Sequence, residues 1–147
     1  MKITEMELEV EDVEWYAVDE SGRIAQFTSG GSLMVPAFVC ESRERLDKIC
    51  TFFDTVGAEK SATVSFSEML PAFPRTDFLQ ECKRIAQKGI YSFTLLQEQG
   101  ITQYKPVCRP HSELLLWDLP EPIQQLLYHN QLRNVSFHSL QGISFTP

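Results

Sequence analysis

The fold is decided by a hairpin sequence near the N-terminus, Val13-Glu-Trp-Tyr-Ala-Val-Asp-Glu-Ser-Gly-Arg-Ile-Ala-Gln-Phe-Thr28. Its first half is rich in aromatic and β-branched residues, which is typical of a strand. Asp19-Glu-Ser-Gly22 then predicts a turn, because Asp favours the opening position and Gly tolerates a positive φ angle. The residues that follow, 23–28, predict the returning strand. The stretch therefore predicts a β-hairpin.

Beyond the hairpin, the sequence predicts an alternation of helices and short strands. Pro36 indicates an extended or edge segment. Ser42 is suited to cap a helix that Gly57 ends, and Thr76 is suited to cap a second one. The turn Gln99-Gly100 separates two strands. In chain order we expect helix 42–57, strand 62–66, loop 70–75, helix 77–88, strands 90–96, 101–108 and 112–117, a short helix from Pro120, and strand 134–140.

This order of elements indicates the fold class. Short strands paired by tight turns, with helices inserted between them, favour an α+β fold over a doubly wound one. We expect a mainly antiparallel sheet of short strands, two longer helices and one short helix. No repeat, low-complexity tract or linker divides the sequence, so we expect a single α+β domain over residues 1–147.

The segment before the hairpin admits two structures. Glutamates at every second position from Glu5 to Glu11 alternate with apolar residues, which is typical of a half-buried edge strand. Helical spacing of apolar residues from Ile3 to Val13, together with a capping box formed by Thr4 and Glu7, favours a helix instead. The sequence leaves both structures open for residues 1–12.

The negative charge of the chain is concentrated at this end. The net charge is −7, and the first 20 residues hold one cation and eight anions, while the remaining residues are balanced. Such a surface repels a phosphate backbone, so nucleic-acid binding is not expected. It is either a solvated face or a surface that attracts a basic protein. The predicted partner-binding residues are Glu5, Glu7, Glu9, Glu11, Asp12 and Glu14.

The composition is that of a globular chain that needs neither a disulfide nor a metal ion to fold. The chain has 147 residues, of which 43% are hydrophobic and 22% charged, so disorder is not expected. Its apolar run around Pro36 is much shorter than the roughly 20 residues of a membrane span. An N-terminus that turns acidic after Lys2 is the reverse of a secretory signal. We therefore expect no membrane association and a cytoplasmic location.

The four cysteines predict structural thiols. Cys40, Cys50, Cys82 and Cys108 contain no C-x-x-C pair, so neither a zinc site nor a redox motif is indicated. In a cytosolic protein such thiols stay reduced and pack as small hydrophobes. We expect no metal and no cofactor.

No catalytic motif of defined spacing occurs. The loop Ser29-Gly-Gly-Ser32 lacks the lysine and the helix start of a phosphate-binding loop. The histidines at 111, 129 and 138 form no metal-binding spacing. Catalytic sets can still be assembled on paper, and they define the rival interpretation of a small hydrolase or ligand-binding enzyme. These sets are Cys108, His111 and Asp118, or Ser112, His138 and Asp19.

Two pairs of adjacent aromatic residues cannot both face one core. Trp15 and Tyr16 point to opposite faces of a strand, and Phe52 and Phe53 diverge around a helix. One member of each pair packs against a second layer or faces a partner, because aromatic residues commonly anchor interfaces. A homodimer is a third interpretation, which only these surplus aromatic residues support.

The hairpin and the helix after it carry one resemblance. The pattern Trp15-Tyr-Ala-Val-Asp19, Gly22, Ile24 and Phe27 resembles that of small bacterial cytosolic proteins, some of which are similar to immunity proteins encoded near secreted toxins. This resemblance covers residues 13–56, including Val35-Pro36, and implies no catalytic residue. Together with the charge, it leads us to expect a non-catalytic bacterial protein-binding module, an immunity-like protein that binds a basic toxin through its acidic N-terminal surface.

Overall fold

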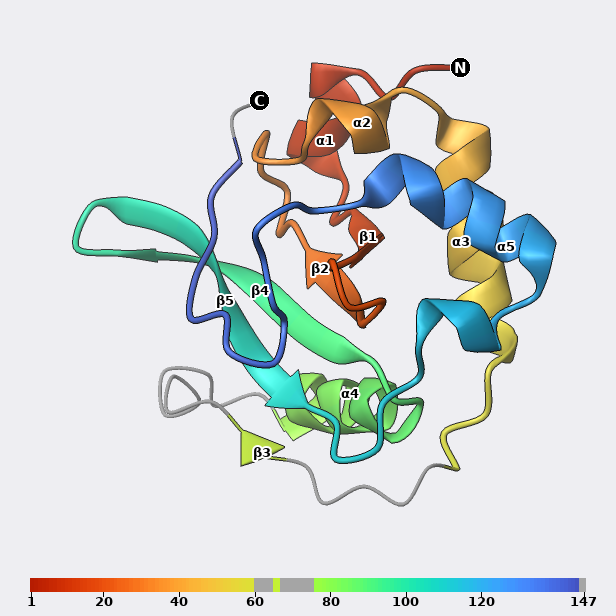
Figure 1. Cartoon of the computed structure of the whole chain (residues 1–147). Helices are drawn as coiled ribbons and strands as arrows, with labels where there is room; N and C mark the ends of the chain where they lie inside the picture. The colour runs from red at the N-terminus through yellow and green to blue at the C-terminus, as the bar shows by residue number, and fades with distance from the viewer. Residues whose placement is uncertain (60–64, 67–75, 146–147) are drawn as a thin grey trace.

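The chain forms an α+β fold around one mixed sheet (Figure 1). The computed structural model describes residues 1–59, 65–66 and 76–145. Counted across the sheet, the second and third strands are parallel to each other, and every other pair of neighbouring strands is antiparallel. The predicted α+β class is therefore confirmed. In order across the sheet, the strands are β1 (Glu14–Val18), β2 (Ile24–Thr28), β4 (Tyr91–Glu98), β5 (Ile101–Arg109) and β3 (Ser65–Phe66).

The predicted hairpin is present as β1 and β2. Its turn is closed by the N–H of Gly22, which donates to the Asp19 carbonyl at 3.1 Å. The Asp19 carboxylate accepts the N–H groups of Ser21 and Arg23, each at 2.9 Å. Gly22 has φ +80°, and a Cβ there would lie 2.6 Å from the ring of Trp117. The turn therefore needs glycine both for its backbone angle and for its close approach to that ring.

The helices also begin largely where their capping residues predict. The Ser42 hydroxyl accepts the N–H of Arg45 at 3.1 Å, and Gly89, at φ +90°, follows the fourth helix. That helix begins at Thr76, one residue before its predicted start. The helices are α1 (Glu5–Val10), α2 (Ala37–Cys40), α3 (Arg43–Thr55), α4 (Thr76–Gln87) and α5 (Glu121–Leu127), with 3-10 turns η2 (Leu116–Asp118) and η3 (Tyr128–Asn130).

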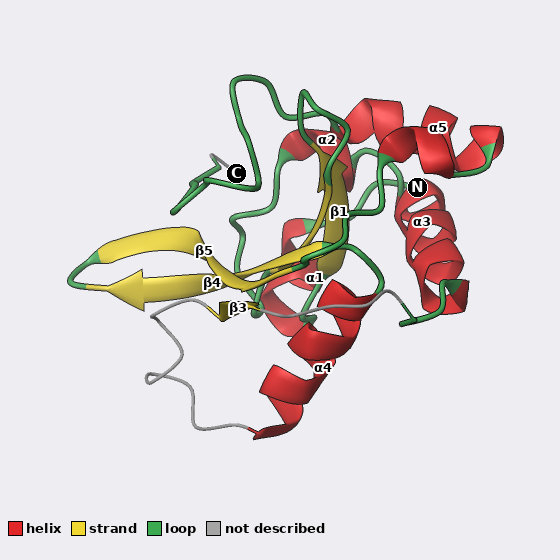
Figure 2. Cartoon of the chain, turned by 60° about the horizontal axis from the view of Figure 1, so that its bottom comes forward, coloured by secondary structure: helices red, strands yellow, loops and turns green. Residues whose placement is uncertain are grey.

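The sheet separates two hydrophobic cores. One contains Trp15 and Phe27 and is covered by α1, α2 and the C-terminal segment 131–145. The other contains Tyr16 and Ile24 and is covered by α3 and α5. The α4 helix packs against β4 and β5, and the end of the β4–β5 hairpin extends past the helices (Figure 2). That hairpin turns at Gln99 and Gly100, as predicted, with φ +50° and +78°.

Two predicted strands are wrong. Residues 112–117 contain no strand, because the Asp118 carboxylate accepts the Leu115 N–H at 2.9 Å and closes η2. Residues 134–140 also form no strand. Asn134 has φ +57°, and the Ser136 carbonyl accepts the N–H groups of Ser139 and Leu140, which makes a turn.

Two other predicted segments differ from the structure or are described only in part. Pro36 precedes the short helix α2, so the extended segment expected there is wrong. The strand predicted at 62–66 is seen at Ser65–Phe66, and its other residues lie outside the described part of the chain, as does the predicted loop 70–75.

The N-terminal segment is a helix and not an edge strand. Thr4 and Glu7 form the predicted capping box, with the two hydrogen bonds at 3.2 Å each. The helix buries Leu8, while Met6 and Val10 are 75% and 77% exposed. The helical alternative is therefore confirmed, although two of its expected inward residues face solvent.

Candidate functional site

The six predicted acids lie on consecutive structural elements at the N-terminal end. Five are exposed, and Glu7 is half-buried. The capping box of α1 fixes where this helix begins and therefore which way its carboxylates point. Glu5, Glu7 and Glu9 belong to α1, Glu11 caps its C-terminus, Asp12 follows, and Glu14 begins β1.

Arg43 of α3 neutralises two of these carboxylates in part. Its Nη2 lies 2.6 Å from Oε2 of Glu7 and 3.1 Å from Oε2 of Glu11. The hydrogen bond from Arg43, followed by those from Thr4, lowers the pKa of Glu7. These ion pairs tie α1 to α3, so only part of the predicted acidic surface is free of an internal cation.

Asp12 and Glu14 have different surroundings. The Asp12 carboxylate accepts the Gly30 N–H at 2.8 Å and so fixes the loop after β2. Glu14 accepts a long hydrogen bond from Gln26, at 3.4 Å. Desolvation raises the pKa of Glu14, and the negative charges of Asp12, Glu81 and Asp54 raise it further. Glu14 is thus a carboxylate that lacks a nearby compensating cation.

Between β1 and α3 lies a cavity of about 230 Å³ that we call the acidic groove. Four carboxylates and one guanidinium line it. A groove with this excess of negative charge concentrates cations near it. Its charged lining residues are Glu11, Asp12, Glu14, Asp47 and Arg43, and Val13, Leu46 and Cys50 complete it.

Asp47 is the groove residue that the sequence did not indicate. It belongs to the charge-balanced part of the chain, and the position of α3 beside β1 alone brings it to the other acids. A helix-wheel argument would place it on the polar side of α3, but nothing in the pattern shows which strand that side meets.

Cys50, at the same groove, is a structural thiol. Its Sγ donates to the Glu14 carbonyl at 3.4 Å. Burial and the carboxylates of Glu14, Asp54 and Asp47 raise its pKa to about 12. The thiol therefore stays protonated near neutral pH and is a poor nucleophile.

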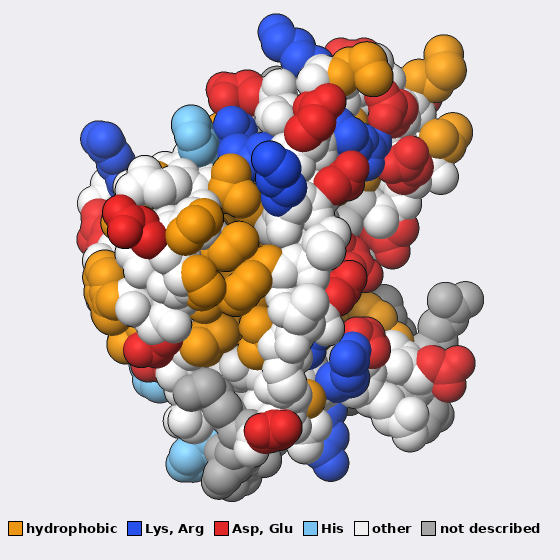
Figure 3. Space-filling view, turned by 90° about the vertical axis from the view of Figure 1, so that its right-hand side faces the viewer, with side chains coloured by type: hydrophobic (Ala, Val, Ile, Leu, Met, Phe, Trp, Pro, Cys, Tyr) orange, Lys and Arg blue, Asp and Glu red, His pale blue; other side chains and the backbone are white. Residues whose placement is uncertain are grey.

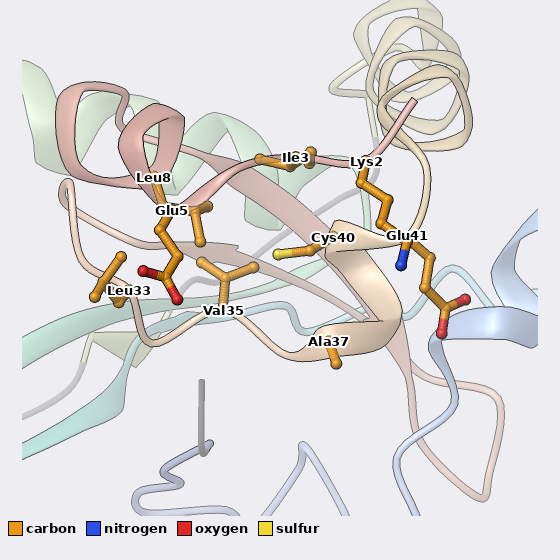
Figure 4. A pocket seen from close by; sticks show the side chains of 9 residues that line it. All are labelled: Lys2, Ile3, Glu5, Leu8, Leu33, Val35, Ala37, Cys40 and Glu41. Carbon is orange, nitrogen blue, oxygen red and sulfur yellow. The ribbon is translucent and has the colours of Figure 1, made fainter.

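A second cavity lies on the other side of α1, between this helix and α2 (Figure 4). We call it the α1–α2 pocket, and its volume is about 360 Å³. Its floor is apolar, and Glu5 extends along it toward Leu33 and Val35 (Figure 4). Lys2 and Glu41 lie at its opposite end. The other lining residues are Ile3, Leu8, Ala37 and Cys40.

A third cavity, the α3–α5 groove, has a volume of about 520 Å³. Its lining is mainly apolar and includes Phe52, the outward member of the adjacent aromatic pair on α3. Sequence reasoning singled out Phe52 but not the residues of α5 opposite it. The lining residues are Asp47, Lys48, Thr51, Phe52, Pro122, Ile123 and Leu126.

In the set of Ser112, His138 and Asp19, the carboxylate and the imidazole have hydrogen-bond partners outside the set. Asp19 is buried and accepts the Phe137 N–H at 2.9 Å in addition to its turn hydrogen bonds. His138 is exposed, and its Nδ1 lies 3.3 Å from the hydroxyl of Tyr91. That hydroxyl donates to Glu113. No histidine lines any of the three cavities formed by described residues.

The set of Cys108, His111 and Asp118 is divided between the interior and the surface. Cys108 is fully buried against Cys82 of α4, and hydrogen bonding to that thiol, followed by burial, raises its pKa. His111 and Asp118 are exposed. All four cysteines are free thiols, and Cys82 and Cys108 pack in a small hydrophobic cluster as predicted.

Residues 1–59, 65–66 and 76–145 contain no group of three or more His, Cys, Asp or Glu side chains arranged to hold a metal ion. No described helix combines the length and the apolar character that crossing a membrane requires.

Comparison of the chain with protein-family models, with curated proteins and with solved structures finds no match. The resemblance of residues 13–56 to small bacterial cytosolic proteins therefore stays an interpretation of the sequence.

Proposed function

We propose that the chain is a non-catalytic module that binds a cationic protein through the acidic groove and the exposed side of α1. The observation that carries this proposal is the charge of the groove, where four carboxylates face a single guanidinium. Positive charges on a partner would be attracted to this groove over several ångströms, because only one cation among the described lining residues, Arg43, offsets its four carboxylates.

Exposed apolar side chains beside the acids support the same proposal. Met6 and Val10 lie four residues apart on α1, which places them on the same side of the helix. Interfaces commonly combine an apolar centre with a polar rim. A cationic partner would cover both Met6 and Val10 while its charges meet the surrounding glutamates.

In its specific form, the proposal is an immunity-like role in the bacterial cytoplasm, in which the partner is a basic toxin. The support for this form is the resemblance of residues 13–56 and the four free thiols, which suit a reducing compartment. Binding alone would suffice for such a role, since an inhibitor acts by covering its target.

The test uses a dye-labelled octalysine peptide and two variants of equal net charge. The first variant, Glu11→Gln/Glu14→Gln/Asp47→Asn, neutralises the acidic groove and leaves Asp12 in place to hold its loop. The control, Glu59→Gln/Asp77→Asn/Glu121→Gln, removes three exposed carboxylates elsewhere. Association is measured by stopped-flow anisotropy.

The groove variant should slow association by about tenfold at low salt, and the control should change it little. Raising the salt concentration to about 0.15 M should slow association with the natural protein more than association with the groove variant. Equal rates for the two variants would show that net charge alone attracts the peptide, and the proposal would then be wrong.

A further inference from the structure

The α3–α5 groove is an apolar surface formed by two neighbouring helices. Phe52 and Thr51 of α3 form one wall, and Ile123 and Leu126 of α5 form the other. Apolar side chains gather on this face of the molecule, with both acidic and basic side chains beside them (Figure 3). The groove volume, about 520 Å³, is large enough for several apolar side chains.

The way these helices pack explains why the groove stays open. The α3 helix buries Ile49 and Phe53, so the adjacent Phe52 is turned away from the core and stays half-buried. In α5 only Leu127 is fully buried, and Ile123 and Leu126 stay half-buried. The apolar part of the groove therefore consists of side chains that the chain's own core does not fully cover.

One residue joins this groove to the acidic groove. Asp47 lines both cavities, since it lies between the two faces of α3. The α3–α5 groove is mainly apolar, and the two charged residues in its described lining, Asp47 and Lys48, have opposite charges. The excess of negative charge begins beyond Asp47, in the acidic groove. A ligand that fills the α3–α5 groove and also reaches the acidic groove needs an apolar face with positive charge at the end that passes Asp47.

The backbone of the groove narrows the choice of ligand further. Both walls are α-helices, which present side chains to the groove and offer no free strand edge. An extended peptide would find no backbone partner there, as it would at a free sheet edge. A helix satisfies its own backbone groups and can bind by side chains alone.

We propose that the α3–α5 groove receives the apolar face of a basic amphipathic helix of the partner, with a lysine or arginine of that helix directed at Asp47 and the acidic groove. This inference rests on the proposed function and adds the partner's chemistry to it.

The experiment uses two dye-labelled peptides of identical leucine, lysine and alanine content. In the first peptide the leucines recur at helical spacing, and in the second the order is scrambled. Affinities are measured by anisotropy for the natural protein, for Ile123→Gln/Leu126→Gln in the groove, and for Glu11→Gln/Glu14→Gln/Asp47→Asn. Ile101→Gln is the matched control, because Ile101 is exposed at the end of the β4–β5 hairpin.

The amphipathic peptide should bind the natural protein at least about tenfold more tightly than the scrambled peptide. The groove variant should abolish this preference, and Ile101→Gln should leave it unchanged. Hydrogen exchange of the natural protein gives a second readout that needs no substitution. The amphipathic peptide should slow exchange in α3 and α5 and the scrambled peptide should not.

The outcomes separate the two proposals. Equal binding of both peptides, or an unaltered preference in the groove variant, overturns the helix inference. The proposed function still stands in that case if the acidic-groove variant weakens both peptides. If that variant weakens neither, the proposed function fails. Sedimentation equilibrium that shows a dimer, lost in Ile123→Gln/Leu126→Gln, overturns the inference in favour of a second copy.

Discussion

Trp15 and Tyr16 are neighbours in the chain, yet they are buried in two different cores. The Trp15 ring stacks on Phe27 with centroids 4.2 Å apart, and Tyr16 stacks on Phe53 at 4.4 Å. Their divergence follows from the alternation of side chains along a strand. The sequence predicted the divergence, and the structure shows that a second layer covers Tyr16.

Replacing Trp15 should test the first of these cores. Trp15→Ala should lower the free energy of unfolding by about 3–5 kcal/mol, because it removes a fully buried indole. The milder Trp15→Phe keeps the stacking but loses the hydrogen bond from Nε1 to the Tyr104 hydroxyl at 3.3 Å, at a cost of about 1 kcal/mol or more. Urea denaturation followed by circular dichroism measures both changes.

The control for this prediction is the other tryptophan of the chain. Trp117 is 60% exposed, so Trp117→Ala should cost roughly 1 kcal/mol or less. A cost as large as that of Trp15→Ala would contradict the assignment of Trp15 to the core.

Tyr104 gives the protein a predictable sensitivity to alkaline pH. Its hydroxyl donates to the Met34 carbonyl at 2.7 Å, and burial raises its pKa to about 12. The unfolded chain releases this proton near pH 10. The contribution of Tyr104 to stability should therefore be complete below about pH 10 and lost as pH rises toward 12.

Comparison with Tyr104→Phe isolates this effect, since burial also raises the pKa values of Tyr16 and Tyr91. The variant should be less stable than the natural protein at about pH 9, by about 1 kcal/mol. Its free energy of unfolding should fall less between about pH 9 and 11. Parallel curves for the two proteins would contradict this assignment.

Among the elements, α1 shows how a local signal can compete with a periodic one. The alternating glutamates predicted a strand, while the Thr4–Glu7 capping box predicted a helix, and the helix formed. A six-residue helix is too short to be stable by itself. The burial of Leu8 and the ion pairs with Arg43 supply the additional stability that this short helix needs. Neither contact is visible in the local sequence pattern.

Arg43 should therefore have opposite effects on stability and on binding. Arg43→Gln should lower the free energy of unfolding by about 0.5–1 kcal/mol, because the pairs with Glu7 and Glu11 are partly exposed. It also removes the one cation of the acidic groove, so the octalysine peptide should bind more tightly at low salt. Denaturation and anisotropy measure the two effects.

A matched substitution at another helix controls for the change in net charge. Arg84→Gln removes an arginine from α4, where it pairs with Glu81 at 3.5 Å. If Arg84→Gln strengthens peptide binding as much as Arg43→Gln does, the binding reflects net charge and not the groove.

At the scale of the whole molecule, the C-terminal segment completes one core without forming a strand. Residues 131–145 cross the sheet, and Phe137 is fully buried there beside Phe27 and Phe93. Arg109 of β5 holds the segment in place. Its guanidinium donates to the carbonyls of Phe137, His138 and Leu140 at 2.7, 2.8 and 2.8 Å.

Loss of this clamp should loosen the segment before the rest of the fold. Arg109→Gln should lower the free energy of unfolding by about 2 kcal/mol, because carbonyls in a partly buried region lose their donor. Hydrogen exchange should accelerate in residues 131–145 and stay unchanged in α3. The free energy of unfolding of Arg109→Lys should fall between those of the natural protein and Arg109→Gln, since a lysine keeps the charge but lacks the planar fork of donors. Uniform acceleration throughout the chain would argue against a local clamp.

The sequence by itself determined the features that depend on residues close together in the chain. The hairpin, its glycine turn, the Gln99-Gly100 turn and the start of α3 at Ser42 all depend on backbone angles and capping within a few residues. The α+β class follows from the order of these elements.

Only the tertiary structure decided which charges are free and which apolar residues stay open. Arg43 reaches Glu7 across 36 residues, and Asp47 meets Glu14 only because α3 lies beside β1. Within the described part of the chain, residues 112–117 make only a single bridge, between Leu115 and Arg23, because η2 begins at the next residue. In residues 134–140 the Ser136 carbonyl accepts the N–H groups of Ser139 and Leu140, which makes a turn where a strand was predicted. Pairing, neutralisation and burial depend on partners distant in the chain, so local patterns do not determine them.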